Sequence, residues 1–230
     1  MKFGIIGAME EEIDLLKSKM TTPKEWHQAN ALFISGEIEG HQVVLVQSGI
    51  GKVNAAIAAT LLISQYEVDT LVNTGSAGGI GKGLVVGDIV VSTQVAYHDV
   101  DATIFDYEIG QVPQMPARYT TDAVLIKKTM AAAANVGLHP VEGLIVTSDS
   151  FIAGKAQIEK IMASFPDALA TEMEGTAIAQ VCYQFGKPFV IVRAMSDIAN
   201  EEAGISFDEF IIEAGKKSAN MVLELLKISK

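Results

Sequence analysis

The chain alternates short apolar runs with stretches in which apolar residues recur every three or four positions. A short apolar run bounded by turn residues predicts a buried strand, and the longer repeat predicts a helix with one face on a core. The apolar runs predict strands at residues 2–6, 32–38, 41–47, 70–74, 88–92, 141–147, 168–171 and 189–194. The helical repeats predict helices at residues 10–20, 53–65, 122–136, 155–164, 174–185 and 206–227. This alternation is typical of an α/β protein.

The apolar runs 32–38 and 41–47 are separated only by Glu39 and Gly40, so they predict a hairpin. Because a hairpin is antiparallel, the sheet cannot be parallel throughout. No stretch that resembles an interdomain linker divides the chain. We therefore expect one domain spanning residues 1–230, with helices on both faces of a central mixed sheet in a three-layer α/β/α arrangement.

The charge balance argues against nucleic acid as a partner. The chain has 17 lysines and arginines against 28 acidic residues, a net charge of −11, and its only arginines are Arg118 and Arg193. A protein that binds nucleic acid needs a basic surface. No apolar run approaches the length of a membrane span, and no cleavage pattern follows the first residues. We expect a cytoplasmic protein that does not bind membranes.

The cysteine and histidines indicate neither redox chemistry nor a metal. Cys182 is the single cysteine, so it cannot form an internal disulfide and is expected to be a packed thiol. His27, His41, His98 and His139 lack the spacing of metal ligands. The sequence therefore predicts no metal and no cofactor.

Three consecutive acids stand where the first strand gives way to the first helix. At about 100° per residue, Leu16 lies about 40° from Glu12, whereas Glu10 lies about 160° away. Glu12 alone of the three therefore leans toward the apolar face. One interpretation is that all three acids offset the helix dipole and are solvated. The other is that Glu12 is a functional carboxylate.

Other unusual residues follow predicted strands, where ligands of α/β sheets bind. They are the glycine-rich stretch 75–79, residues 149–152, the acidic pair around Met173, and Ser196 with Asp197. The glycines do not form the fingerprint of a dinucleotide site. Residues 75–79 are therefore either a tight turn with close backbone packing or a stretch that faces a ligand.

Six ordered strings together resemble the 5′-methylthioadenosine/S-adenosylhomocysteine nucleosidase family. They are GIIGAMEEE at 4–12, QSGIGKVN at 47–54, NTGSAGG at 73–79, YHDVD at 97–101, EME at 172–174 and RAMSD at 193–197. The resemblance implies a nucleoside phosphorylase-like fold and a homodimer. It also implies hydrolysis of the N-glycosidic bond of 5′-methylthioadenosine, S-adenosylhomocysteine and 5′-deoxyadenosine, which releases adenine.

The resemblance assigns the chemistry to two carboxylates. Glu12 is expected to activate the attacking water, and Asp197, oriented by Ser196, to protonate adenine at N7. The bond breaks through an oxocarbenium-like state, so the leaving base must gain a proton. The resemblance places Glu174 and Met173 at the ribose hydroxyls.

The remaining expected site residues surround this centre, also by resemblance. Glu172 and Arg193 support the water and Glu12, Phe151 stacks on adenine, and the Ile152 backbone reads the edge of the base. The other wall residues are Met9, Ile50 and Phe207 at the 5′-thio group, and Ser76 and Gly78. From the sequence alone, a core position is the more common role for an aromatic residue such as Phe151.

Residues 97–119 form a long irregular stretch that contains Pro113. Loops of this length are uncommon unless they cover a site or a partner. By resemblance, Phe105 and Pro113 reach across the dimer interface and complete the neighbouring site. The alternative is a surface loop that covers its own subunit.

The chain departs from the family pattern at three places. Thr147 and Ser148 precede Asp149 where Ser-Gly is more frequent, Asp106 stands where glycine is common, and Gly175 replaces a frequent alanine. None of these changes removes a charged group, so we expect altered loop rigidity with the chemistry retained.

Two other functions fit parts of the sequence. A purine nucleoside phosphorylase would use phosphate in place of water, but phosphate needs cationic donors and arginines are scarce. A non-catalytic sensor of adenosine derivatives would keep the base and ribose contacts but would need neither Glu12 nor Asp197. The nucleosidase uses both.

Overall fold

The computed structural model describes residues 1–198 and 203–230. The strands within these residues are β1 (Lys2–Gly7), β2 (Thr21–Gln28), β3 (Ala31–Ile38), β4 (His41–Gln47), β5 (Thr70–Gly79), β6 (Ile89–Tyr97), β7 (Tyr119–Thr120), β8 (Pro140–Thr147), β9 (Ala168–Glu172) and β10 (Phe189–Asp197). The helices are α1 (Glu10–Ser18), α2 (Lys52–Ser64), the short 3₁₀ helix η1 (Thr103–Phe105), α3 (Ala123–Asn135), α4 (Lys155–Ser164), α5 (Gly175–Phe185) and α6 (Ala203–Lys227).

The strands form one mixed sheet, as the hairpin predicted. β1 lies between β4 and β5 and is parallel to both, while β3 and β4 form the antiparallel hairpin. β5 also pairs with β10 in parallel and with the end of β9 in antiparallel register. Since β10 pairs with β6, β6 with β8 and β8 with β9, these strands and β5 close into a ring.

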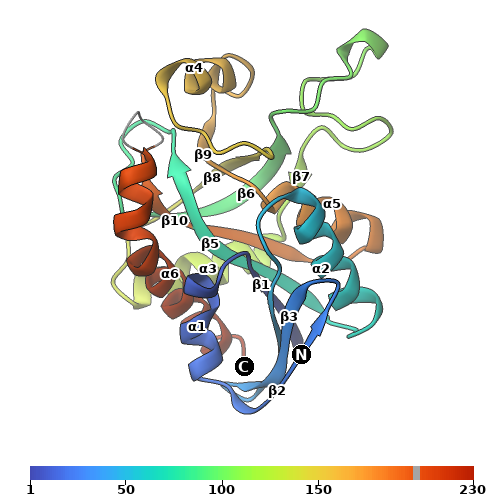
Figure 1. Cartoon of the computed structure of the whole chain (residues 1–230), viewed down its shortest axis with the longest axis vertical. Coiled ribbons are helices and arrows are strands. Elements are labelled where there is room, and N and C mark those ends of the chain that lie inside the picture. The colour runs from blue at the N-terminus through green and yellow to red at the C-terminus, as the bar shows by residue number, and fades with distance from the viewer. Residues whose placement is uncertain (199–202) are drawn as a thin grey trace.

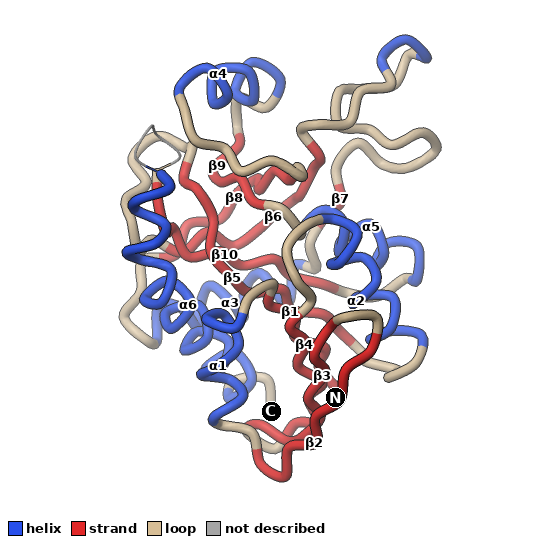
Figure 2. Tube along the Cα trace, in the orientation of Figure 1, coloured by secondary structure: helices blue, strands red, loops and turns tan. Residues whose placement is uncertain are grey.

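Helices cover both faces of the sheet, which confirms the predicted α/β class (Figures 1 and 2). Alternate residues of a strand point to opposite faces. On β1, Phe3 and Ile5 belong to the apolar cluster that also contains residues of α1, α3 and α6, whereas Ile6 belongs to the cluster that contains residues of α2 and α5. A third, smaller apolar cluster lies under α4. The two large cores hold the carboxyl ends of the central strands in fixed positions.

β2 and the two-residue strand β7 were not predicted, and three other strands were predicted too short. β2 is an edge strand with mostly exposed, polar residues, so it has no apolar alternation to detect. The tight-turn alternative for residues 75–79 was wrong, because β5 continues through Gly79 by pairing with β10 and β9. β6 and β10 also extend past the predicted ends, and Ser196 and Asp197 are therefore the last residues of β10.

The helix ends agree with the predictions except at α6. The Asp122 carboxylate accepts hydrogen bonds from the N–H groups of Val124 and Leu125 at the start of α3, and Gly186 ends α5 in the left-handed conformation. α6 begins at Ala203, so Ser206 lies within its first turns instead of capping them. The predicted capping box itself cannot be described, because the Ser206 side chain lies outside the described residues.

The segment between β6 and β7 projects away from the rest of the protein (green, Figure 1). It contains η1, and Asp106 directly after η1 is left-handed, with φ of 63°. This conformation explains why glycine is suited to the position, and aspartate tolerates it better than most residues. Over residues 1–198 and 203–230, no helix combines the length and apolar character needed to cross a membrane.

Candidate active site

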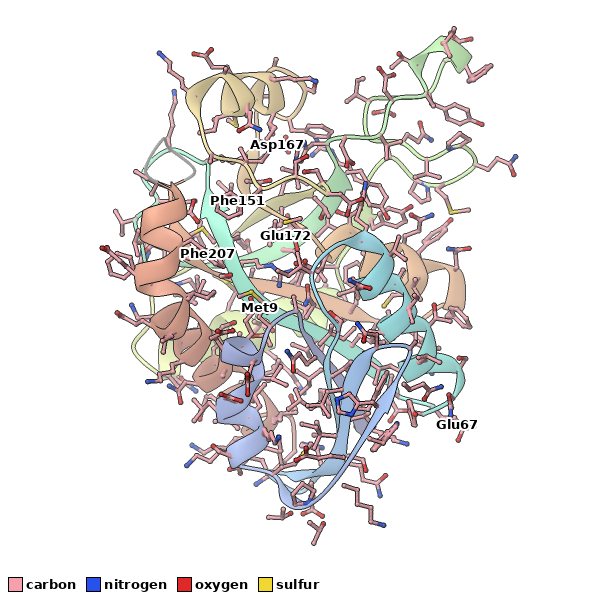
Figure 3. All side chains as sticks on the ribbon, in the orientation of Figure 1. Met9, Glu67, Phe151, Asp167, Glu172 and Phe207 are labelled. Carbon is pink, nitrogen blue, oxygen red and sulfur yellow. The ribbon has the colours of Figure 1, made fainter. Side chains whose placement is uncertain are left out.

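A pocket with about 590 Å³ of empty space, part of it open to solvent, lies at the carboxyl ends of β1, β5, β9 and β10. Figure 3 shows Met9, Phe151, Glu172 and Phe207, which come from different parts of the chain, around this region. The lining residues are Ala8, Met9, Glu12, Ile50, Ser76, Ala77, Gly78, Ser150, Phe151, Ile152, Thr171, Glu172, Met173, Glu174, Ser196, Asp197 and Phe207.

Glu12 is buried at one side of the pocket, whereas Glu10 and Glu11 are exposed. One carboxylate oxygen accepts hydrogen bonds from the N–H groups of Ala8 and Met9, at 2.7 and 3.3 Å. The other accepts the N–H and the hydroxyl of Ser76, at 3.0 and 3.2 Å. The carboxylate therefore joins the start of α1 to β5. The helical periodicity correctly predicted which of the three acids faces inward.

Gly75 allows Glu12 to approach β5 so closely. A Cβ atom at Gly75 would lie 2.6 Å from Oε1 of Glu12, well inside contact distance. The sequence left two interpretations of residues 75–79 open, a ligand-facing stretch and a tight turn; Ser76, Ala77 and Gly78 line the pocket, and the tight turn does not form. The structure instead shows a strand glycine that leaves room for a side chain, which is one of the roles of glycine within strands.

Glu172 and Arg193 form a buried ion pair behind the pocket wall. The Arg193 side chain is 1% exposed, and its Nη2 group donates to Glu172 and, at 2.6 Å, to Asn73 Oδ1. Asn73 in turn donates to the Ile6 carbonyl, and the Thr147 hydroxyl donates to Glu172. Buried charges need such partners, because desolvation without them is unfavourable.

Glu174 lies next to this pair but is held by fewer groups. Its Oε1 accepts the N–H of Gly51 at 2.9 Å, and its Oε2 lies 3.6 Å from Nη2 of Arg193. Burial and the neighbouring Glu172 carboxylate raise the pKa of Glu174 from 4.5 to about 8, against the opposing effect of Arg193. A group that changes charge near neutral pH within a pocket is a candidate functional group.

Ser196 and Asp197 are buried at the end of β10. The pairing of β10 with β5 shifts register between Met195 and Asp197, a bulge that re-aims the last side chains of the strand. Both residues consequently line the pocket. The Ser196 hydroxyl donates to Oδ2 of Asp197 at 2.9 Å, which orients the carboxyl group.

The other wall of the pocket is apolar, in contrast to the side that holds the buried carboxyl groups. Phe151 is 46% exposed and its ring meets that of Phe207 edge to face, with 5.7 Å between the ring centroids (Figure 3). Phe151 therefore faces the pocket and is not a core aromatic. Ile152 is buried beside it, and Met9 and Ile50 complete the apolar lining.

Three expected site residues do not line the pocket. Arg193 lies behind it, in contact with Glu172 and Glu174. Phe105 and Pro113 lie on the projecting segment, where both are exposed, Phe105 by 72%. They do not contribute to the pocket of their own chain.

Sequence analysis also missed several residues of the site. Asn73 appeared only within a quoted string and Thr147 only as a departure from the family pattern, because a buried polar contact depends on which strands become neighbours. Ala8, Ala77 and Ser150 line the pocket within stretches that were singled out but were not named individually, and Thr171 carries no chemical signal that distinguishes it. Among residues 1–198 and 203–230, no cluster of three or more histidine, cysteine or acidic side chains has an arrangement that could hold a metal ion.

The chain is similar in sequence to a known superfamily of proteins. Residues 2–227 match the Phosphorylase superfamily. Two relatives are 5′-methylthioadenosine/S-adenosylhomocysteine nucleosidases, from Halalkalibacterium halodurans (52% identical, covering 98% of this chain and 97% of the relative) and Listeria innocua (54% identical, covering 99% of each). The chain belongs to the phosphorylase superfamily and, within it, to the 5′-methylthioadenosine/S-adenosylhomocysteine nucleosidase family.

A solved structure supports the same assignment. The nucleosidase of that name from Neisseria meningitidis, in complex with methylthio-immucillin-A, is 48% identical and superimposes with a TM-score of 0.97 over 99% of both chains. The nucleoside phosphorylase-like fold implied by the sequence resemblance is thereby confirmed. The chain is an enzyme of the N-glycosyl hydrolase class.

Proposed function

We propose that this enzyme hydrolyses the N-glycosidic bond of 5′-methylthioadenosine and S-adenosylhomocysteine, and also that of 5′-deoxyadenosine. The observation that carries the proposal is the presence in one pocket of two buried, separately held carboxyl groups, Glu12 and Asp197, beside an exposed aromatic wall. The names of the relatives and of the Neisseria structure support the choice of substrates.

In the proposed reaction, the bond between the ribose carbon and the adenine nitrogen breaks, and its electron pair stays with adenine. Asp197, oriented by Ser196, gives a proton to adenine N7 as the charge on the base develops. The oxygen of a water molecule bonds to the ribose carbon, and Glu12 accepts a proton from that water. The products are adenine and the 5′-substituted ribose.

The contacts of Glu12 suit the role of the base. Its carboxylate is fixed by donors from both the first helical turn and β5, so its orientation is set before the substrate binds. Such preorganisation lowers the cost of reaching the transition state. Glu172 and Arg193 provide the rigid, charge-balanced surface behind it.

Glu174 and Met173 are proposed to hold the ribose hydroxyls. A carboxyl group accepts hydrogen bonds from hydroxyl groups, and its ionised form, which becomes populated as pH approaches the raised pKa of about 8, also favours the positive charge that develops on the sugar. Phe151 is proposed to stack on adenine and the Ile152 backbone to read its edge. Met9, Ile50 and Phe207 then enclose the 5′-thio group, for which a polarizable methionine is well suited.

The arginines argue against the phosphorylase alternative. Arg193 is buried and engaged by Glu172 and Asn73. Arg118 makes a bidentate pair with Asp167, at 2.6 and 3.1 Å, and does not line the pocket. Neither guanidinium is available to a phosphate in the pocket, and the Glu12 and Glu172 carboxylates there would repel one.

We further propose a homodimer in which the segment 97–119 reaches the neighbouring subunit. The exposure of Phe105, Ile104 and Pro113 on a projecting segment supports this arrangement. Large apolar side chains displayed together commonly mark an interaction surface.

The experiment that tests the function is chromatography of the products formed from 5′-methylthioadenosine, with and without phosphate and with and without a chelator. The proposal expects adenine and free 5-methylthioribose at the same rate in every case. A ribose 1-phosphate product would establish the phosphorylase alternative, and a complete lack of turnover with tight binding would favour the sensor.

A further inference from the structure

Two loops that are distant in sequence border the pocket. The first, residues 48–51, carries Ile50 and the Gly51 N–H group that binds Glu174. The second, residues 148–152, carries Ser150, Phe151 and Ile152. Neither loop belongs to a helix or a strand, so other contacts must fix their positions relative to each other.

Lys52, the first residue of α2, joins these two loops. Its N–H group donates to Oδ1 of Asp149 at 2.9 Å, and its ammonium group lies 3.3 Å from Oδ2 of the same carboxylate. The ammonium group also donates to Asp99 at 2.7 Å. The Asp149 N–H in turn donates to Asp99 at 3.2 Å, and the Lys52 ammonium lies 5.3 Å from the centre of the Tyr97 ring.

These contacts differ from those of an isolated surface ion pair. One ammonium group lies between two carboxylates that would otherwise repel each other, and the backbone N–H groups of Lys52 and Asp149 take part. The Lys52 and Asp99 side chains are 20% and 30% exposed, so solvent screens this pair less than it screens the Lys17 and Glu25 pair, whose side chains are 37% and 43% exposed; the Asp149 side chain is 54% exposed.

The contacts of Lys52 also influence the ribose side of the pocket. Gly51 and Lys52 are adjacent, so the peptide groups that bind Glu174 and Asp149 follow each other in the chain. Gly51 has a φ of 100°, which only glycine adopts readily. A movement of Lys52 would therefore move the Gly51 N–H away from Glu174.

We infer that Lys52 is a positioning residue: through Asp99 and Asp149 it holds the loop at 148–152 against the loop at 48–51 and so sets the width of the base-binding end of the pocket. Lys52 itself does not line the pocket. The inference rests on the proposed function, in which Phe151 and Ile152 bind adenine.

The test compares Lys52→Met with Lys17→Met, a matched control at an ion pair remote from the pocket. Lys52→Met keeps the apolar stem and removes the charge. We expect the dissociation constant of adenine and the KM for 5′-methylthioadenosine to rise about tenfold while kcat changes much less, because the acids stay in place. Lys17→Met should change neither constant. Unchanged binding in a folded Lys52→Met would overturn the inference.

Asp149→Asn and the double variant separate coupling from a general loss of stability. If the two side chains act through one contact, the double variant binds adenine about as weakly as Lys52→Met alone. Additive losses would contradict the inference. Lys52→Arg, which keeps the charge, should restore most of the affinity.

Amide hydrogen exchange provides a readout that does not depend on the proposed substrate. The N–H groups of Gly51, Lys52 and Asp149 should exchange faster in Lys52→Met than in the wild type, and those of Lys17→Met should not. If the wild type fails to bind adenine, the proposed function is wrong, and the exchange rates alone decide whether Lys52 couples the loops. Equal exchange rates in both proteins would overturn the coupling.

Discussion

Ser76 donates both its N–H group and its hydroxyl to the same oxygen of Glu12, at 3.0 and 3.2 Å. The other oxygen of Glu12 is bound by the first turn of its own helix. Each carboxylate oxygen thus meets only hydrogen-bond donors. A glutamine side chain would place its NH₂ group at one of the two positions, so it could not accept hydrogen bonds at both. The effect of replacing this carboxylate by an amide can be measured directly as a change in turnover.

Glu12→Gln should lower turnover of 5′-methylthioadenosine by about 10²-fold or more, since the amide cannot accept the proton of the water. Asp197→Asn should lose about as much, because it has no proton to give. The exposed neighbour Glu10→Gln serves as the control and should remain active. Adenine release by folded, purified variants is the measurement. Near wild-type turnover by either variant would refute the role of that residue.

Gly75→Ala should reduce activity without a change in any charged group. The new methyl group would lie 2.6 Å from Glu12 Oε1, so the carboxylate must move and the rate should fall by about tenfold or more. Gly40→Ala is the contrasting control, because nothing lies within 4 Å of its Cβ position and its φ is 82°. That change should cost about 1 kcal/mol of stability and leave the rate unchanged. Equal rates for both variants would show that Glu12 tolerates displacement.

The raised pKa of Glu174 predicts how stability depends on pH. Its pKa is about 8 in the folded protein and near 4.5 in the unfolded chain, so the folded state binds the proton more tightly. The stabilising contribution is complete below pH 4.5 and is lost as pH rises toward 8. The slope is at most about 1.4 kcal/mol per pH unit. Urea unfolding of wild type and Glu174→Gln at several pH values in this window should show a flatter dependence in the variant. Parallel curves would contradict the assignment.

Phe105→Ala should weaken substrate binding by about 1 to 3 kcal/mol through loss of apolar enclosure. If Phe105 serves the neighbouring site, mixing an inactive Phe105 variant with Asp197→Asn under subunit exchange restores activity. In a mixed dimer one site inherits both lesions and the other neither. About half of the dimers are mixed at equal proportions, so activity should recover toward about a quarter of wild type. No recovery despite verified exchange would mean that Phe105 acts within its own subunit.

The sequence predicted those parts of the fold that carry a local signal. The helical period placed Glu12 on the inner face of α1, and Gly186 marked the end of α5. β2 carried no such signal, because an exposed edge strand has no apolar face. The extension of β5 through Gly79 depends on pairing with β10 and β9, which are distant from β5 in the sequence. Local propensity for a turn was overridden by that pairing.

The site was predicted where strings of residues are distinctive, and missed where chemistry depends on topology. The pocket brings together Glu12, Glu174 and Asp197 from three parts of the chain. The contact of Arg193 with Asn73 and the role of Gly75 could not be read from the sequence, because both require knowing that β5 lies between β1 and β10. The reason for glycine at position 175 also could not be read from the sequence. A Cβ there would lie 2.9 Å from Ile191 Cγ2, a contact set by the packing of α5 on β10.

The closed ring of strands limits how ligands can enter and leave. β5 is paired with β10 along nearly its whole length and with β1 and then β9, so no strand of the ring can separate without breaking ladders on two sides. The acids on β9 and β10 are thus fixed to a frame that does not open. Exchange of substrate and product must depend on the two bordering loops and the side chains they carry. Changes in those loops can consequently alter which 5′-substituent is accepted while leaving the proton-transfer groups where they are.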